Sequence, residues 1–304
     1  GQPAAVFAAG VLWRGHPLAE MFLAAVGIAV AAIPEGLPAV VTITLAIGVT
    51  RMARRKAIVR RLPAVETLGA VGVICSDKTG TLTRNELTVR TVVTAEERLE
   101  VTGTGWAPRG QFVRGEEEIA VDQQPQLLEL SRAALLCCDA SLHEKDGEGW
   151  VLQGDPTDGA LVCMAMKAGL DPRHESAELS RRDVIPFESE HRYMATLHHD
   201  HRGHARIFVK GAPEQLLSMC GRERRADGSA TPLDERAWRR RVDALAAAGQ
   251  RVIAVATREA TPGKGELAFD DVQGLTLLGL LGLIDPPREE AVAAVREEIG
   301  RAHV

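Results

Sequence analysis

The sequence predicts an α/β protein that begins with membrane helices. Three observations lead to this fold class. Residues 21–50 form an apolar stretch with one charged side chain, residues 69–76 form a short β-type run with little alternation, and residues 88–270 mix short strands, turns and helices. An unalternating apolar strand is typical of a parallel sheet buried on both faces. The expected architecture is therefore membrane helices followed by α/β and α+β parts.

Composition excludes several classes of protein. The chain has 304 residues, of which 45% are hydrophobic and 25% are charged, and its formal net charge is −5. These values fit one to three globular domains and exclude a collagen-like, disordered or disulfide-framework chain. No basic field favours nucleic acid, so we expect no nucleic-acid partner. Five cysteines without a Cys-x-x-Cys pair indicate reduced thiols in the cytosol.

The apolar stretch 21–50 is long enough to cross a membrane. As a continuous helix it would span roughly 45 Å, against a hydrocarbon core of about 30 Å. Six Lys and Arg residues follow within 51–61, which places that end in the cytoplasm. The apolar residues 1–12 would be the end of an earlier span, so residues 1–50 are interpreted as membrane helices in contact with lipid. The alternative is a buried core helix.

Polar features interrupt the middle of this span. Pro34, Gly36 and Pro38 remove helical hydrogen bonds and free backbone carbonyls, and Glu35 adds a carboxylate at the same depth. Ionisable groups and broken helices inside a membrane are typical of transporter cation sites. The alternative is a simple kink, with Glu35 facing a neighbouring helix.

Beyond residue 62 the pattern predicts a series of strands and helices. Strands are expected at 69–76, 193–198, 205–210, 251–256 and 275–284; helices are expected at 126–136, 157–168, 231–249 and 289–299. Residues 200–203 would form the turn of a hairpin. Thr231 is the expected N-cap of the 231–249 helix, with Pro232 in its first turn.

The segment Asp77-Lys78-Thr79-Gly80-Thr81-Leu82-Thr83 follows the first expected strand. A carboxylate at the end of a parallel strand points toward the ligand crevice, and Asp77 could accept a phosphoryl group. Lys78 adds positive charge, and the Thr and Gly groups after it can surround phosphate oxygens. Mg²⁺ is implied, with Asp77 and Thr79 near it. Thr79 stands where many phosphatases carry a second aspartate, so an aspartyl-phosphate should persist. The alternative is that Asp77 only caps a loop.

This seven-residue segment resembles the phosphorylation signature of P-type cation-transporting ATPases, and of the calcium-pump-like subfamily in particular. The resemblance implies a Rossmann-like phosphorylation domain of the haloacid dehalogenase type, interrupted by an inserted α+β nucleotide-binding domain. Residues 51–87 would be the stalk and the first part of the phosphorylation domain, 88–274 the insert, and 275–304 a truncated second part. It also implies Asp77, Lys78 and Thr79 as catalytic residues and ATP with Mg²⁺ as cofactors.

The membrane motif is also similar to a segment of these pumps. Pro34-Glu35-Gly36-Leu37-Pro38 resembles the ion-binding part of the fourth transmembrane helix in calcium-type pumps. The resemblance implies Glu35 and the carbonyls of Val30, Ala31 and Ile33 as cation ligands. Oxygen ligands suit Ca²⁺ first, with Na⁺ or Mn²⁺ behind it. The Cys-Pro pair of soft-metal pumps is not found in this motif.

Five further positions match the nucleotide pocket of the family. Lys210-Gly211-Ala212-Pro213-Glu214 resembles its pocket signature, which implies Lys210 and Gly211 as binding residues, together with Thr79. Phe187 matches a phenylalanine that stacks on adenine. Asp158 stands where the family usually has glutamate, and Arg251 matches an arginine that reaches the phosphates.

The family's proteins are much longer. The resemblance therefore implies a fragment of a prokaryotic plasma-membrane pump that lacks the actuator domain and the C-terminal half, and whose main partner is the missing remainder. We expect cytoplasmic catalytic domains that bind ATP without completing transport. Two other functions stay open: a soluble-type phosphatase or phosphotransferase of the haloacid dehalogenase class, and a non-catalytic nucleotide-binding module.

Overall fold

The computed structural model describes residues 17–31, 36–147 and 149–301, and the chain divides into two compact units, Gly1–Cys75 and Ser76–Val304. Each unit is considered by itself. Ile33 and Glu35 of the expected cation site lie outside the described residues, as does the apolar stretch 1–12.

The described residues of the first unit include three helices. These are α2 (Leu18–Ala31), α3 (Gly36–Arg54) and α4 (Pro63–Gly69). Neither α2 nor α3 has a buried residue, although both are strongly apolar. Among the described residues, the region from Leu18 to Arg54 that contains α2 and α3 is the one candidate for crossing a membrane, by length and composition only. This agrees with the expected span over 21–50.

The strand expected at 69–76 does not form. Residues 71–77 have no regular secondary structure, and Val73 and Ile74 are 76% and 71% exposed. A strand exists only when its backbone hydrogen bonds are made by a neighbouring strand. Among the described residues no strand pairs with this segment, so its apolar pattern alone does not produce a ladder. The following residues form a single π-turn, η1 (Lys78–Leu82).

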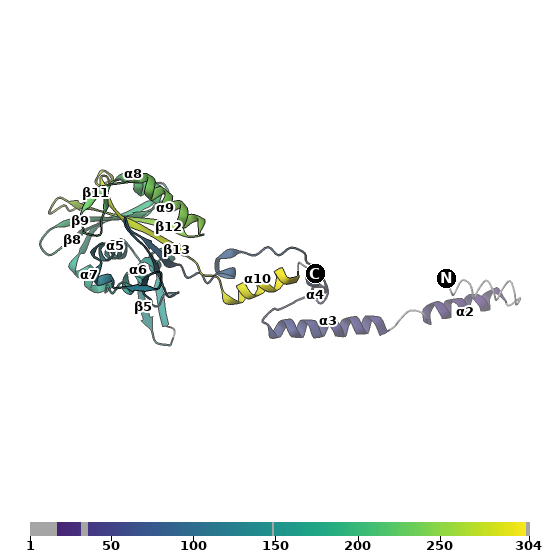
Figure 1. Ribbon diagram of the computed structural model, residues 1–304. Coiled ribbons are helices and arrows are strands. Elements are labelled where there is room, and N and C mark those ends of the chain that lie inside the picture. The colour runs from purple at the N-terminus through teal and green to yellow at the C-terminus, as the bar shows by residue number, and fades with distance from the viewer. Residues whose placement is uncertain (1–16, 32–35, 148, 302–304) are drawn as a thin grey trace. The chain divides into compact units, whose positions relative to one another are not determined.

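The second unit is built on a sheet of eleven strands (Figure 1). Nine of them follow the order β4-β3-β2-β1-β13-β12-β9-β8-β7, and β10 pairs with β13 and β11. Neighbours are antiparallel except β10 and β13, which are parallel. Hairpin β5–β6 forms a separate two-stranded sheet. The strands are β1 (Thr88–Val93), β2 (Arg98–Val101), β3 (Phe112–Arg114), β4 (Glu117–Ile119), β5 (Ser141–Lys145), β6 (Gly149–Gln153), β7 (Ser180–Ile185), β8 (Tyr193–His199), β9 (Ala205–Gly211), β10 (Cys220–Arg224), β11 (Ala230–Pro232), β12 (Arg251–Ala260) and β13 (Leu275–Ile284).

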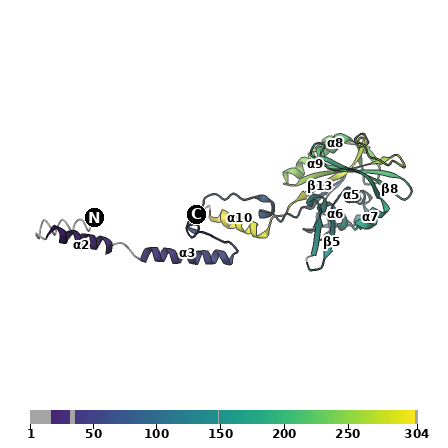
Figure 2. The same cartoon turned by 180° about the vertical axis from the view of Figure 1, so that it is seen from behind.

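Helices cover both faces of this sheet, as the opposite views in Figures 1 and 2 show. Residues of α5 and α6 join one buried apolar cluster, and residues of α8 and α9 join another on the opposite face. Met194 of β8 belongs to the first cluster and Ala195 to the second, as the two-residue period of a strand requires. The remaining elements are α5 (Pro125–Leu136), α6 (Pro156–Lys167), α7 (Pro172–Glu178), α8 (Pro213–Met219), α9 (Glu235–Ala247), α10 (Glu289–Arg301), η2 (Val121–Gln123) and η3 (Phe269–Asp271).

Most expected elements of this unit are present. The hairpin is β8–β9, the expected helices at 126–136 and 157–168 are α5 and α6, and the strand at 275–284 is β13. The place of β13 differs from the expectation, however. It lies in the middle of the large sheet, between β1 and β12, and not in a separate domain. The boundary expected between 274 and 275 would cut this strand from its own sheet. A continuous apolar run looks the same in a parallel strand and in a central antiparallel strand covered on both faces.

Helix α9 begins later than the sequence suggested. Thr231 and Pro232 belong to β11, and the helix starts at Glu235 with Asp234 as its N-cap. The Asp234 carboxylate accepts a hydrogen bond from the backbone N–H of Ala237 at 3.0 Å. Thr231 pairs with Glu223 in the β10–β11 ladder, so the helix can begin only after this strand.

The cap can be tested by matched substitutions. We expect Asp234→Ala to lower the free energy of unfolding by about 1 kcal/mol, because one N–H of the first turn loses its acceptor. Thr231→Val removes the hydroxyl group and keeps the branched shape, so its effect should stay within about 0.5 kcal/mol. Chemical denaturation measures both values. The reverse order of effects would restore Thr231 as the cap.

Candidate functional site

A cavity of about 530 Å³ lies among α6, β9, β12 and the segment that precedes β8. Its volume is typical of sites for small molecules and cofactors. The five residues matched to a nucleotide pocket outside the Asp77 loop all line this cavity: Asp158, Phe187, Lys210, Gly211 and Arg251. The fold thus brings together residues that are widely separated in the sequence.

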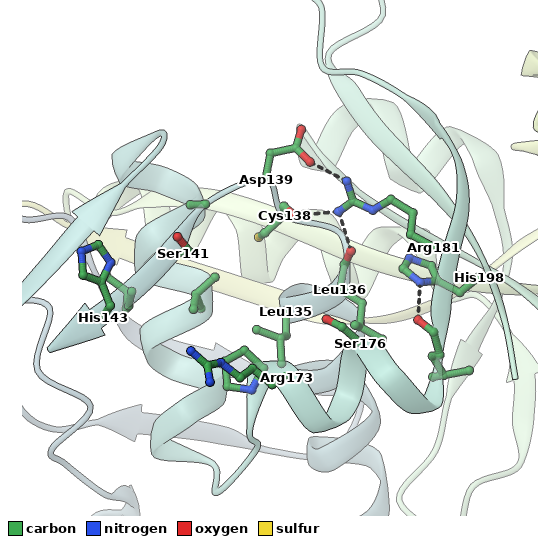
Figure 3. A pocket seen from close by; sticks show the side chains of 15 residues that line it. Leu135, Leu136, Cys138, Asp139, Ser141, His143, Arg173, Ser176, Arg181 and His198 are labelled. Atoms are coloured by element: carbon green, nitrogen blue, oxygen red, sulfur yellow. Dashed lines mark hydrogen bonds and ion pairs between the residues drawn. The ribbon is translucent and has the colours of Figure 1, made fainter. Parts of the chain in front are cut away.

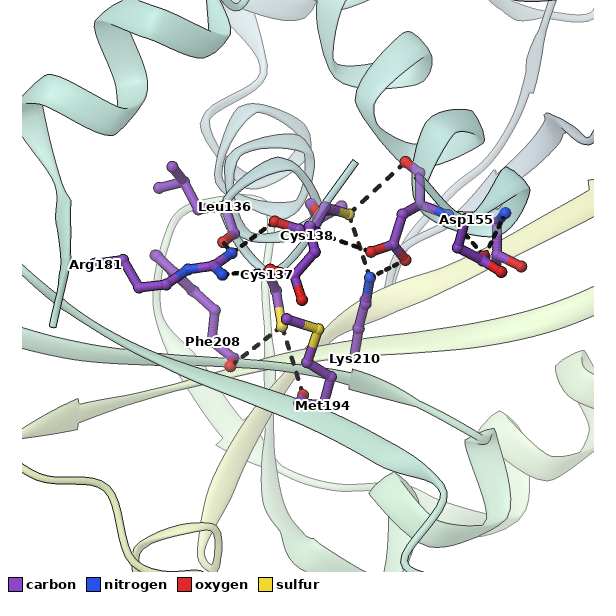
Figure 4. A network of polar contacts seen from close by, with 12 residues as sticks. Leu136, Cys137, Cys138, Asp155, Arg181, Met194, Phe208 and Lys210 are labelled. Carbon is purple, nitrogen blue, oxygen red and sulfur yellow. Dashed lines mark hydrogen bonds and ion pairs between the residues drawn. The ribbon is translucent and has the colours of Figure 1, made fainter. Parts of the chain in front are cut away.

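A buried ion pair forms one wall of the cavity. The ammonium of Lys210, on β9 and labelled in Figure 4, contacts the carboxylate of Asp158, in the first turn of α6. The two side chains are only 8% and 14% exposed. The Lys210 Nζ atom also lies 3.3 Å from Sγ of Cys138. Burial by itself lowers the pKa of Lys210, but the neighbouring sulfur atoms and the Asp158 carboxylate outweigh it, so this pKa lies above its usual value.

The Asp158 carboxylate is held from two sides. Its Oδ1 atom faces Lys210, and its Oδ2 atom accepts a hydrogen bond from the backbone N–H of Asp139 at 2.9 Å. Helix α6 is capped by Asp155, whose Oδ1 atom accepts from the N–H of Thr157 at 2.7 Å. An aspartate in place of the expected glutamate therefore still reaches the lysine.

Arg181 of β7 fixes the segment that carries Asp139. Its Nη1 atom lies 2.5 Å from the Asp139 carboxylate, and its Nη2 atom donates to the carbonyls of Leu136 and Cys138 at 2.9 and 2.6 Å (Figure 4). These bonds hold the end of α5. The wall is therefore a chain of contacts from Arg181 through Asp139 and Asp158 to Lys210.

Gly211 ends β9 where two backbones approach closely. It pairs with Tyr193 of β8, and a Cβ atom at Gly211 would lie 2.5 Å from the carbonyl oxygen of Arg192. Arg192 itself adopts a left-handed conformation, with φ of 58°, and its guanidinium pairs with Glu214 at 3.1 Å. Side chains avoid this conformation unless the surroundings enforce it. Arg192 also lines the cavity, although the sequence motifs did not predict it as a pocket residue.

An aromatic ring and a cation complete the lining. Phe187 is 56% exposed and lines the cavity, so its ring is available for contact with a ligand. Arg251 stands exposed at the start of β12 and makes no ion pair among the described residues. A flat apolar face and a free guanidinium suit a ligand with a planar ring and an anionic group.

The Asp77 loop lies elsewhere in the same unit, and residues 285–288 hold it. Thr83 donates its hydroxyl to the Asp285 carboxylate at 2.5 Å, and Arg288 donates to the carbonyls of Gly80 and Thr83 at 3.2 and 3.0 Å. Asp77 and Lys78 are exposed, and neither of them lines the cavity described above. Within the described ranges no group of three or more His, Cys, Asp or Glu side chains is arranged to hold a metal ion.

Comparison with known families agrees with this geometry. The family model for the cytoplasmic N domain of P-type ATPases matches residues 126–290, which include every residue named in the cavity. The match also includes β13, in accord with the place of that strand in the large sheet.

Several curated proteins match nearly the full chain. "Cation-transporting ATPase pma1" of Synechocystis sp. is 48% identical over 297 residues, which are 96% of this chain and 33% of that protein. "Calcium-transporting ATPase" of Bacillus subtilis is 42% identical, with 96% and 33% covered. Human "Calcium-transporting ATPase type 2C member 1" is 39% identical, with 92% and 29% covered. The chain thus spans about a third of the length of these relatives. With the family model matching more than half of its residues, the chain belongs to the P-type cation-transporting ATPases and contains their nucleotide-binding N domain.

Proposed function

We propose that this chain is the ATP-binding and phosphoryl-accepting part of an ion pump that moves a cation, Ca²⁺ in the first place, across a membrane. The observation that carries the proposal is the single cavity that gathers Asp158, Phe187, Lys210, Gly211 and Arg251. The pump would lie in a prokaryotic plasma membrane, with the second unit in the cytoplasm.

The lining suggests how a nucleotide binds. The adenine ring stacks on the exposed face of Phe187. The phosphates lie toward Arg251 and Arg192, because guanidinium groups form bidentate hydrogen bonds with phosphate. Lys210 is already neutralised by Asp158, so in this proposal it shapes the adenine end of the cavity and does not bind the phosphates.

The chemical step is proposed at Asp77. A carboxylate oxygen of Asp77 attacks the terminal phosphorus of ATP, the bond to the bridging oxygen breaks, and ADP leaves. Lys78 neutralises part of the charge on the transferred group. Mg²⁺ in such sites is commonly held by one or two carboxylates together with substrate phosphates, and Asp77 with Thr79 fits that small donor set. The bound ion would neutralise charge on the phosphates.

The cation site is proposed at Glu35 and the carbonyls of Val30, Ala31 and Ile33. Val30 and Ala31 belong to α2 and directly precede the motif region in the sequence, and the prolines of the motif remove backbone N–H donors that a continuous helix would offer to such carbonyls. The names of the Bacillus subtilis and human relatives favour calcium.

In vesicles that carry a pump of full family length with this sequence, we expect Ca²⁺, and not Na⁺ or Mn²⁺, to stimulate ATP hydrolysis. A Glu35→Gln variant should lose that stimulation. Stimulation by Na⁺ alone would overturn the choice of ion.

A pair of phenylalanines tests the nucleotide site. Phe187 and Phe269 are similarly exposed, at 56% and 59%, but only Phe187 lines the cavity. We expect Phe187→Ala to weaken ATP binding by about tenfold or more, because stacking on an aromatic side chain contributes roughly 1–3 kcal/mol per base. Phe269→Ala should leave the dissociation constant unchanged. Calorimetric titration of the full chain measures both, and equal affinities of the two variants would reject the site.

A further inference from the structure

A second cavity, of about 650 Å³, lies beside the proposed nucleotide site. The ends of α5 and β7, the hairpin strand β5, helix α7 and strand β8 all contribute to its lining. Figure 3 shows Arg173 and His143 on one side of it and Arg181 and His198 on the other. The family resemblance implies no role for these residues, and the proposed function assigns none to the cavity.

The lining combines an apolar floor with polar groups. Leu135, Leu142 and Leu179 supply apolar surface. Arg173 is exposed, and its guanidinium makes no ion pair among the described residues, whereas Arg181 is occupied by Asp139 and two carbonyls. An unpaired guanidinium above an apolar floor suits an organic anion with an apolar body.

His198 supplies a second, independent feature. Its side chain is 1% exposed, and its Nδ1 atom lies 2.9 Å from the carbonyl oxygen of Leu179. A carbonyl only accepts hydrogen bonds, so Nδ1 carries the proton and Nε2 is an acceptor. Nε2 has no partner in the described structure. Burial lowers the pKa of His198 to about 4, so the ring is neutral at pH 7. A buried acceptor without a partner is costly, and a ligand that donates a hydrogen bond would remove that cost.

The two cavities share a wall. Asp139 lines both of them. Its backbone N–H donates to Asp158 on the nucleotide side, and its carboxylate pairs with Arg181 on the other side. A ligand that moves Arg181 or Asp139 would therefore alter the support of the Lys210–Asp158 pair.

We propose that the second cavity is a regulatory site for a small organic anion that has an apolar body and a hydroxyl or amine donor. Its occupation changes nucleotide affinity through Asp139. The coupling rests on the proposed function of the neighbouring cavity, but the binding site itself does not.

A suitable probe is 4-hydroxyphenylacetate, which has a carboxylate for Arg173, a ring for the leucine floor and a hydroxyl donor for His198. Saturation-transfer-difference NMR on the full chain in detergent detects weak binding directly. We expect a signal for the wild type that falls several-fold in Arg173→Ala and in His198→Asn. Asparagine can still donate to the Leu179 carbonyl but lacks the Nε2 acceptor. Arg182→Ala, which removes the next cation on β7 from outside the lining, should keep the signal.

The same experiment separates the site from its coupling. The wild-type signal should persist when ATP is added, and the probe should change the ATP dissociation constant by roughly fivefold, a typical coupling between sites. No probe signal, an unchanged signal in Arg173→Ala and His198→Asn, or full displacement by ATP would overturn the site. Binding that leaves ATP affinity unchanged would overturn the coupling. If the chain binds the probe but not ATP, the proposed function fails and the second site remains.

Discussion

Replacing Lys210 with methionine is expected to lower the free energy of unfolding of the second unit by about 3–5 kcal/mol, the usual result of removing one partner from a buried ion pair. The Asp158 carboxylate, 14% exposed, would lose the ammonium that faces it. The same substitution should weaken ATP binding, because the wall of the cavity would relax. Denaturation followed by tryptophan fluorescence measures the first effect, and calorimetric titration measures the second.

A double-mutant cycle separates this pair from general damage. Lys210→Met combined with Asp158→Leu removes both charges, so the double variant should be more stable than the sum of the two single effects predicts. Arg239→Met is the control, since Arg239 pairs with Glu235 at 2.6 Å on the exposed surface of α9. Exposed pairs of this kind contribute about 1 kcal/mol or less. Additive effects at Lys210 and Asp158 would show that the two side chains do not stabilise each other.

Much of the second unit was predictable because its patterns are local. The β8–β9 hairpin has mostly apolar, strand-forming residues on both sides of the turn at Asp200, whose carboxylate accepts from the N–H groups of Arg202 and His204. Helices α5 and α6 show apolar residues at helical spacing. By contrast, the segments 69–76 and 275–284 are both apolar β-type runs, and one of them forms no strand while the other joins the central sheet. Pairing partners decide such cases, and a run of apolar residues does not specify its partners.

The candidate site was predictable where short motifs mark it and not where contacts between distant segments build it. Lys210 and Gly211 stand in a recognisable motif. Asp139 holds Asp158 through its backbone N–H, which every residue except proline possesses, and Arg181 holds Asp139 and two backbone carbonyls some forty residues away along the chain. Neither role leaves a pattern of side-chain types. The sequence clue to Arg192 in the cavity lining was its position as a cation five residues after Phe187. The left-handed backbone conformation of Arg192 could not be inferred from its residue type.

Gly211→Ala is expected to have the second-largest effect. The new methyl group would lie 2.5 Å from the Arg192 carbonyl oxygen and 2.7 Å from Cα of Tyr193, distances that no side-chain rotation relieves. Strands β8 and β9 would have to separate locally, which we expect to destabilise the second unit by about 1–3 kcal/mol, the usual cost of inserting a methyl group into a packed region. Since Lys210 precedes this residue and Arg192 faces it, the shift would move two parts of the cavity wall.

Gly221→Ala provides the control, because Gly221 lies on β10 with no atom within 4 Å of a Cβ atom built there. Its stability and ATP affinity should match those of the wild type, whereas Gly211→Ala should bind ATP about tenfold more weakly, a change that corresponds to about 1.4 kcal/mol. The melting temperature and the dissociation constant are measured on the same samples. If Gly211→Ala lost stability but bound ATP normally, the close approach of β8 and β9 would be a feature of the fold alone. Weaker binding by protein that is still folded at the temperature of titration would instead show that this approach sets the shape of the cavity.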